Sequence, residues 1–108
     1  WTEKTVLLGK AGDLRGAETA AREAIRLDPF HSLAHFNLGV ALHRMGRLAE
    51  AERALRKAVL LDPRHDASWA ELGHVRHEKG DAAGAAEAYR RAVALGRSDL
   101  RNRGQLPI

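Results

Sequence analysis

The 108-residue sequence contains no cysteine and only three prolines, and aromatic residues make up 5% of it. Without cysteine the chain has no disulfide, no thiolate nucleophile and no cysteine-bound metal. The lack of cysteine suits a reducing compartment, so we expect a cytoplasmic location. No apolar run approaches the roughly 18 residues that a membrane-spanning helix needs, and we expect no membrane partner.

Catalytic motifs are missing as well. The sequence contains no G-x-S-x-G, no glycine-rich phosphate loop and no H-E-x-x-H helix. We therefore predict that the chain is not an enzyme and that it binds no cofactor. Its net charge of +4 is modest and spread along the chain, which permits acidic partners without requiring nucleic acid. RNA binding is disfavoured because few aromatic rings are present to stack on bases, although outer and tail arginines are available: Arg53, Arg56, Arg90, Arg91, Arg97, Arg101 and Arg103.

What the sequence does contain is an internal repeat. Gly12, Gly46 and Gly80 recur at a constant step of 34 residues. The pair Leu38-Gly39 returns at the same step as Leu72-Gly73. The step also relates Ala17, Ala51 and Ala85, then Ala24, Ala58 and Ala92, then Leu27, Leu61 and Leu95. A period of this length indicates stacked copies of one supersecondary unit.

Each copy predicts two helices joined at a glycine. Apolar residues recur at steps of three and four, which is the spacing of one helix face. Asp28-Pro29 and Asp62-Pro63 end helices, because proline disfavours helical geometry in the residue before it. Asp13, Ser32, Asp66 and Asp81 are the predicted N-caps. We predict helices at 1–11, 14–27, 33–45, 48–61, 67–79 and 82–95, with Gly12 ending the first and Gly96 the last.

These residues resemble the tetratricopeptide repeat (TPR), whose pattern is W-x2-L-G-x2-Y, then A-x3-F, then A and P. The third copy matches best, with Trp69, Leu72, Gly73, Ala85, Tyr89 and Ala92. The resemblance implies an all-α fold, a right-handed superhelical stack of antiparallel helix pairs with about three motifs and six helices. It places a partial repeat at 1–31, full repeats at 32–65 and 66–99, and a tail or truncated capping helix at 100–108.

The first and last copies depart from the pattern. Lys4-Thr5 stands where Leu-Gly is expected, so the first helix is poorly specified. Arg97 replaces the proline that ends the other copies. The sequence has no initial methionine and Trp1 enters the pattern mid-repeat, which leads us to expect a piece of a longer polypeptide.

In TPR proteins the first helix of each pair lines a concave surface that holds partner peptides or helices. The resemblance implies a groove here with an apolar centre at Leu33, Phe36 and Val40, which fits an apolar segment with some acidic character. A carboxylate clamp of lysines and asparagines is not expected, since Asn37 is the only matching residue. The full predicted groove is Leu33, Phe36, Asn37, Val40, His43, Arg44, Ala70, Glu71, His74 and His77.

Three of those residues raise the question of a metal site. His43, His74 and His77 would suit zinc by type. Neighbouring copies stand about 10 Å apart, however, so His43 and His77 would not reach one ion unaided. We therefore expect no metal, and interpret the histidines as groove side chains that gain charge below about pH 6.5.

The resulting prediction is a protein–protein interaction module that binds a peptide or helix and has no catalysis of its own. Two alternatives remain open. One is self-assembly into a homo-oligomeric scaffold through the open ends of the stack. The other is a regulatory TPR segment of a larger bacterial enzyme.

Overall fold

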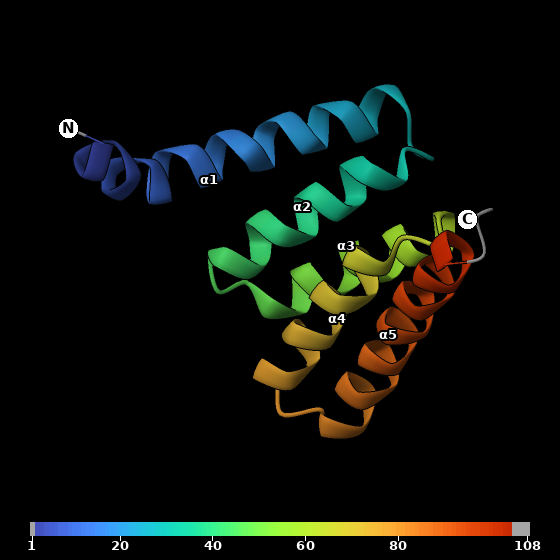
Figure 1. Ribbon diagram of the computed structural model, residues 1–108. Helices are drawn as coiled ribbons and strands as arrows, with labels where there is room; N and C mark the ends of the chain where they lie inside the picture. Colours follow the sequence, from blue (N-terminus) through green and yellow to red (C-terminus); the bar gives the residue numbers. More distant parts are fainter. Residues whose placement is uncertain (1, 105–108) are drawn as a thin grey trace.

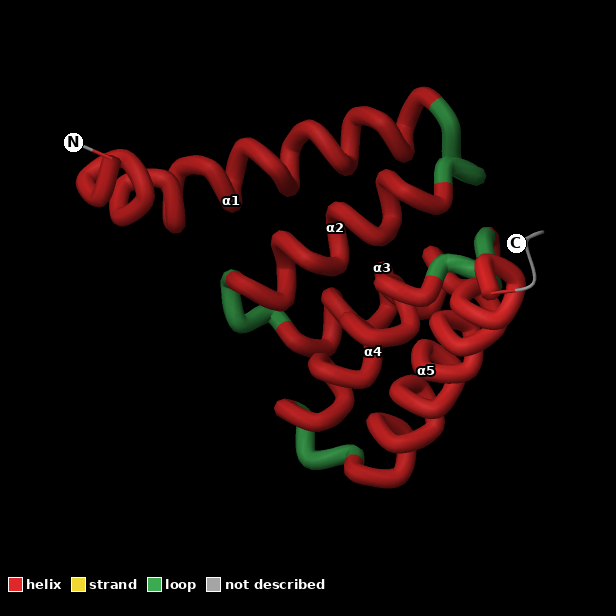
Figure 2. The backbone as a smooth tube through the Cα atoms, in the orientation of Figure 1, coloured by secondary structure: helices red, strands yellow, loops and turns green. Residues whose placement is uncertain are grey.

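Five helices make up the computed structural model, which describes the backbone of residues 2–104 and the side chains of residues 13–97. They are α1 (Thr2–Leu27), α2 (Ser32–Arg44), α3 (Leu48–Leu61), α4 (Asp66–Glu78) and α5 (Ala82–Gly104). Residues 2–104 contain no strand. The chain runs back and forth between neighbouring helices joined by short loops (Figures 1 and 2). The predicted all-α helical-repeat class is confirmed.

Two antiparallel hairpins, α2–α3 and α4–α5, repeat the same construction. Each turns at a glycine with positive φ, 80° at Gly46 and 87° at Gly80, a conformation that residues with a Cβ adopt only at a cost. Within each pair a second glycine lets the helices touch. A Cβ on Gly39 would lie 2.5 Å from Leu55 Cγ, and one on Gly73 would lie 2.7 Å from the Tyr89 ring. The glycines at the repeat period are therefore turn and packing residues.

The core lies where α2, α3 and α4 meet. Leu42, Leu55, Leu72 and Val75 are almost completely buried there. Each stabilises the fold by about 1.5–3 kcal/mol relative to an exposed side chain. Small residues let the helix backbones approach each other, namely Ala51, Ala54, Ala58, Ala85 and Ala88, all of them buried. Among the described residues, no helix is both long enough and apolar enough to cross a bilayer.

The predicted break at Gly12 is wrong. The two helices expected at 1–11 and 14–27 are a single helix, α1, so the structure has five helices rather than six. Asp13, a predicted N-cap, consequently lies inside a helix. The physical reason lies in the sequence before the turn. Where α2 and α4 carry Leu-Gly to hold a second helix, the first copy carries Lys4-Thr5, and nothing favours a turn over a continued helix.

The predicted stop at Gly96 is also wrong, because α5 continues to Gly104. The helices α1 and α3 end before Asp28-Pro29 and Asp62-Pro63 respectively. The third copy has Arg97 at the proline position, and a glycine alone does not end a helix. Residues 105–108 and Trp1 lie outside the described residues, and the repeat boundaries stay predictions.

Two of the other predicted caps are displaced by one residue. His31, rather than Ser32, caps α2, and its Nδ1 accepts a hydrogen bond of 3.0 Å from the Ala34 amide. His65 occupies the N-cap of α4, so Asp66 falls in the first turn of that helix. Asp81 caps α5 as predicted, since its Oδ1 accepts a 2.9 Å bond from the Gly84 amide.

Candidate functional site: a groove between α1, α2 and α4

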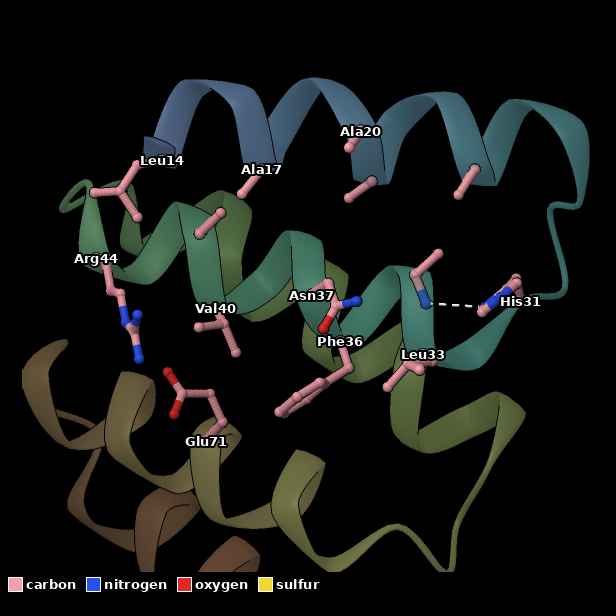
Figure 3. Close-up of a pocket in the computed structure, with 14 residues that line it drawn as sticks. Leu14, Ala17, Ala20, His31, Leu33, Phe36, Asn37, Val40, Arg44 and Glu71 are labelled. Atoms are coloured by element: carbon pink, nitrogen blue, oxygen red, sulfur yellow. Dashed lines mark hydrogen bonds between the residues drawn. The ribbon is translucent and has the colours of Figure 1, made fainter. Parts of the chain in front are cut away.

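A cavity of about 680 Å³ lies between α1 and α2 and reaches α4 at Glu71. Figure 3 shows α1 above it, α2 along its length and the Glu71 side chain rising from below. Most of the lining is apolar. The lining residues are Leu14, Ala17, Ala20, Ala21, Ala24, His31, Leu33, Ala34, Phe36, Asn37, Val40, Ala41, Arg44 and Glu71.

The α1 wall is a stripe of alanines. Ala17, Ala20, Ala21 and Ala24 succeed each other at steps that keep them on one helix face, and the labelled Ala17 lies at the edge of α1 that faces α2 in Figure 3. The equivalent Ala51 and Ala85 of the other repeats are covered by the preceding helix, whereas Ala17 is exposed. The cavity is therefore open on the side where the other two repeats have a helix.

The α2 wall supplies the larger apolar side chains. Leu33 is 50% exposed although it is a leucine, and Phe36 and Val40 beside it are half-buried. The Phe36 ring meets the His65 ring edge-on, with centroids 5.0 Å apart and planes at 87°. Because His65 precedes α4, this contact holds Phe36 at the seam between the second and third repeats.

Charge gathers at the end of the cavity near the C-terminus of α2. Arg44 and Glu71 both direct their polar groups into that corner (Figure 3). His43 lies next to it, and its two ring nitrogens contact the carboxylates of Glu71 and Glu78 on α4. Carboxylates accept hydrogen bonds, so this arrangement favours the protonated imidazole, in which both ring nitrogens donate. Burial opposes that charge, but the bonds to Glu71 and Glu78 outweigh it and raise the pKa of His43.

The cavity brings together six of the ten predicted groove residues: Leu33, Phe36, Asn37, Val40, Arg44 and Glu71. The other four lie elsewhere. His43 is occupied by the two glutamates, and Ala70 is half-buried on α4. His74 packs edge-on against Tyr89 of α5, at 5.4 Å between centroids, and His77 is exposed. The described residues contain no cluster of three or more side chains suited to hold a metal ion.

Sequence reasoning missed the whole α1 wall, His31, Ala34 and Ala41. The alanines of α1 have the spacing of a helix-packing face, and that spacing gives no sign that they line a cavity. Only the continuous α1 leaves that face open to the cavity.

The family is shown by a comparison with known proteins. A family profile described as "Tetratricopeptide repeat" matches residues 6–54 and 44–99, which together cover most of the chain. The chain belongs to the tetratricopeptide repeat family. The TPR fold is in general that of non-catalytic protein-interaction modules. No curated protein sequence matches the chain significantly.

Solved TPR structures share the arrangement. MamA from Desulfovibrio magneticus RS-1, residues 41 to the end, is 28% identical with a TM-score of 0.76 over 90% of this chain and 55% of its own. The second TPR of Spaghetti (RPAP3), solved with the HSP90 peptide SRMEEVD, is 22% identical with a TM-score of 0.76 over 86% of both chains. The secretion translocator chaperone SycD of Yersinia enterocolitica is 18% identical with a TM-score of 0.75, over 86% of this chain and 64% of its own. The last two likenesses concern the fold alone. The present chain spans about half the length of the MamA structures that it matches.

Proposed function

We propose that this TPR domain binds a segment of a partner protein in the cavity between α1, α2 and α4. The observation that carries the proposal is the apolar lining left open to solvent, above all Leu33 at 50% exposure beside Phe36 and Val40. An open apolar cavity gains free energy when a partner removes it from water, and a preformed wall needs little reordering to do so. The likeness to a TPR solved with a bound peptide supports this use.

The charges at the cavity end indicate the partner's chemistry. Arg44 is exposed and makes no ion pair with any described side chain. Glu71 is already paired with His43. An apolar segment with an acidic residue near Arg44 fits this arrangement. A clamp for a C-terminal carboxylate is less well supported, because Asn37 is the only residue of that type in the cavity. The domain needs no catalytic group or cofactor for this role. The absence of cysteine supports a reducing, cytoplasmic setting for it.

The test compares two exposed leucines. Leu33→Asp places a charge in the cavity, while Leu60→Asp makes the same change at a 72% exposed position of α3 outside the cavity lining. Immobilised wild-type chain and Leu60→Asp should retain the same partner from a lysate of the source organism. Leu33→Asp should lose it, with affinity lowered at least about tenfold by titration calorimetry, since a buried unpaired charge costs several kcal/mol.

Two results would contradict the proposal. One is retention of the partner by Leu33→Asp at wild-type affinity. The other is equal loss with Leu60→Asp, which would mean that the surface around Leu60 or general stability controls binding. Circular dichroism of both variants checks that the helices are intact. Arg44→Glu then tests whether the partner segment carries an acidic residue near Arg44. It should weaken binding less than Leu33→Asp does, because Arg44 is at the exposed rim.

A further inference from the structure

The last helix, α5, has one packing partner where α3 has two. Among the described helices, the backbone of α3 lies close to both α2 and α4, whereas that of α5 lies close to α4 alone, at the edge of the stack (Figure 1). The 34-residue step relates Val59 of α3 to Val93 of α5. Val59 is 8% exposed and belongs to the core, while Val93 is 51% exposed. A face that α3 buries is therefore open to solvent on α5.

This face of α5 is hollowed, and its centre is apolar. It forms a cavity of about 440 Å³ lined by Tyr89, Arg90, Val93, Ala94 and Arg97. The lining residues succeed one another along about two turns on one side of the helix. The Tyr89 ring is held from behind by α4, where it packs against Gly73 and His74. Beyond Arg97 the helix continues to Gly104, so that stretch extends past the cavity instead of folding back over it.

The charges on this face differ from those that join the other repeats. Glu18 of α1 pairs with Arg47 at 3.0 Å. Its repeat equivalent on α3, Glu52, pairs with Arg76 of α4 at 3.2 Å. In both cases a carboxylate on a second helix meets a cation from the repeat that follows. On α5 the same position is Ala86, so this carboxylate is missing.

Both charged residues of the α5 cavity are cations. Arg90 and Arg97 line it, and neither makes an ion pair with a described side chain. Arg91 is engaged elsewhere, with its guanidinium 4.9 Å from the centre of the Trp69 ring, and Glu87 lines a different cavity. A further repeat that brought a cation, or a second copy of this same face, would meet like charge here.

We propose that this face of α5 binds an amphipathic helix of a partner protein, with acidic residues beside its apolar stripe. The apolar stripe covers Tyr89 and Val93, and the carboxylates reach Arg90 and Arg97. No residue lines both this cavity and the one between α1, α2 and α4. The inference therefore goes beyond the proposed function and does not rest on it.

The test uses two synthetic peptides of about 18 residues, long enough for a helix to form. Both carry leucines along one helix face, and the flanks are glutamates in one peptide and lysines in the other. Each is titrated into isotopically labelled Leu33→Asp chain, which keeps the peptide out of the other cavity, and backbone amide shifts report where it binds. The glutamate peptide should shift residues 89–97 and bind at least about tenfold more tightly than the lysine peptide.

Variants on the same background test the two parts of the face. Val93→Asp should weaken the glutamate peptide at least about tenfold, because it places a carboxylate at the apolar centre. Leu60→Asp, the same charge at a 72% exposed position of α3, should leave binding unchanged.

The charge reversal Arg90→Glu/Arg97→Glu should weaken the glutamate peptide roughly tenfold and strengthen the lysine peptide. Arg15→Glu, at an exposed position of α1, should change neither. Circular dichroism checks that all variants remain folded.

Three results overturn the proposal. Equal binding of the two peptides would show that Arg90 and Arg97 do not select an acidic helix. Failure of the glutamate peptide to shift residues 89–97 would show that this face does not bind it. Self-association that Val93→Asp abolishes, measured by sedimentation without peptide, would make a second copy the occupant. None of these results bears on the comparison of Leu33 with Leu60 above, because that comparison concerns the other cavity.

Discussion

The first repeat and the two later repeats are built from matching residues and adopt different shapes. Gly46 and Gly80 leave the helix with positive φ and reverse the chain, whereas Gly12, at the same position of the period, stays inside a helix of 26 residues. A glycine therefore permits the turn but does not cause it. The cause is the contact made after the turn, where Gly39 meets Leu55 and Gly73 meets Tyr89. The first repeat lacks that pairing, and Ala17 of its second helix is exposed where Ala51 and Ala85 are buried.

The largest expected effect comes from giving the second repeat the residues of the first. Leu55→Ala installs the alanine found at Ala21 in a site with no solvent exposure. It should lower the free energy of unfolding by about 2–5 kcal/mol, measured by urea denaturation.

The double variant Gly39→Thr/Leu55→Ala sharpens this comparison, because it gives the second repeat the residue types that the 34-residue step places at Thr5 and Ala21. Gly39→Thr alone should cost about 1–3 kcal/mol by crowding Leu55. The two changes together should cost clearly less than their sum, since each relieves the defect of the other. Simple additivity would show that the exchanged sizes do not compensate at this contact.

A smaller effect, with opposite signs in the two regions, is expected at the turn glycines. Gly46→Ala should destabilise the fold by about 1–2 kcal/mol, because its φ of 80° is unfavourable for alanine and no neighbouring atom crowds the new Cβ. Gly12→Ala should instead stabilise by up to about 1 kcal/mol, as alanine is the better residue inside a helix. Thermal unfolding of both variants measures this. Destabilisation by Gly12→Ala would mean that the first repeat also turns at its glycine.

The smallest expected effect concerns the contact between the second and third repeats at His43. The pKa of His43 is raised in the folded protein, so the contact contributes its full stability below the unfolded value of about 6.5. That contribution is lost as the pH rises through the raised folded pKa. It should amount to less than about 1 kcal/mol, because Glu78 is half-exposed.

His43→Gln should remove this pH dependence. The measurement is the urea midpoint at pH 6 and at pH 9, compared between wild type and variant. His77→Gln is the matched control, as His77 is the repeat equivalent of His43 and is exposed. A wild-type slope that survives in His43→Gln would show that another group causes the pH dependence.

The sequence was sufficient for the fold class because the packing residues recur. The 34-residue step relates Leu38, Gly39 and Leu55 to Leu72, Gly73 and Tyr89. These residues pack in the interior of the two later repeats. The ends of the stack could not be predicted in this way. Whether α1 breaks at Gly12 or α5 stops at Gly96 depends on the packing partners available beside each glycine. Lys4-Thr5 replaces the Leu-Gly pair of the other copies, and Arg97 replaces their proline.

The candidate site was predictable on one side only. Leu33, Phe36 and Val40 belong to a first helix and were expected in the groove because of the resemblance. Ala17 and its neighbours have the spacing of a packing face, and sequence alone does not reveal that this face is uncovered. The histidines were ambiguous for another reason. Equivalent positions have different neighbours, so His43 meets two carboxylates, whereas His77 makes no ion pair with a described side chain.

The difference between the repeats depends on α1 running through Gly12 without a turn. Backbone chemical shifts of uniformly labelled protein, recorded at low concentration, report the conformation of all three turn glycines in one spectrum. We expect helical Cα shifts for Gly12 and its neighbours on both sides, and non-helical shifts for Gly46 and Gly80. A Gly12 shift that matches those of Gly46 and Gly80 would contradict this difference, because the first repeat would then be closed like the others and its alanine wall covered.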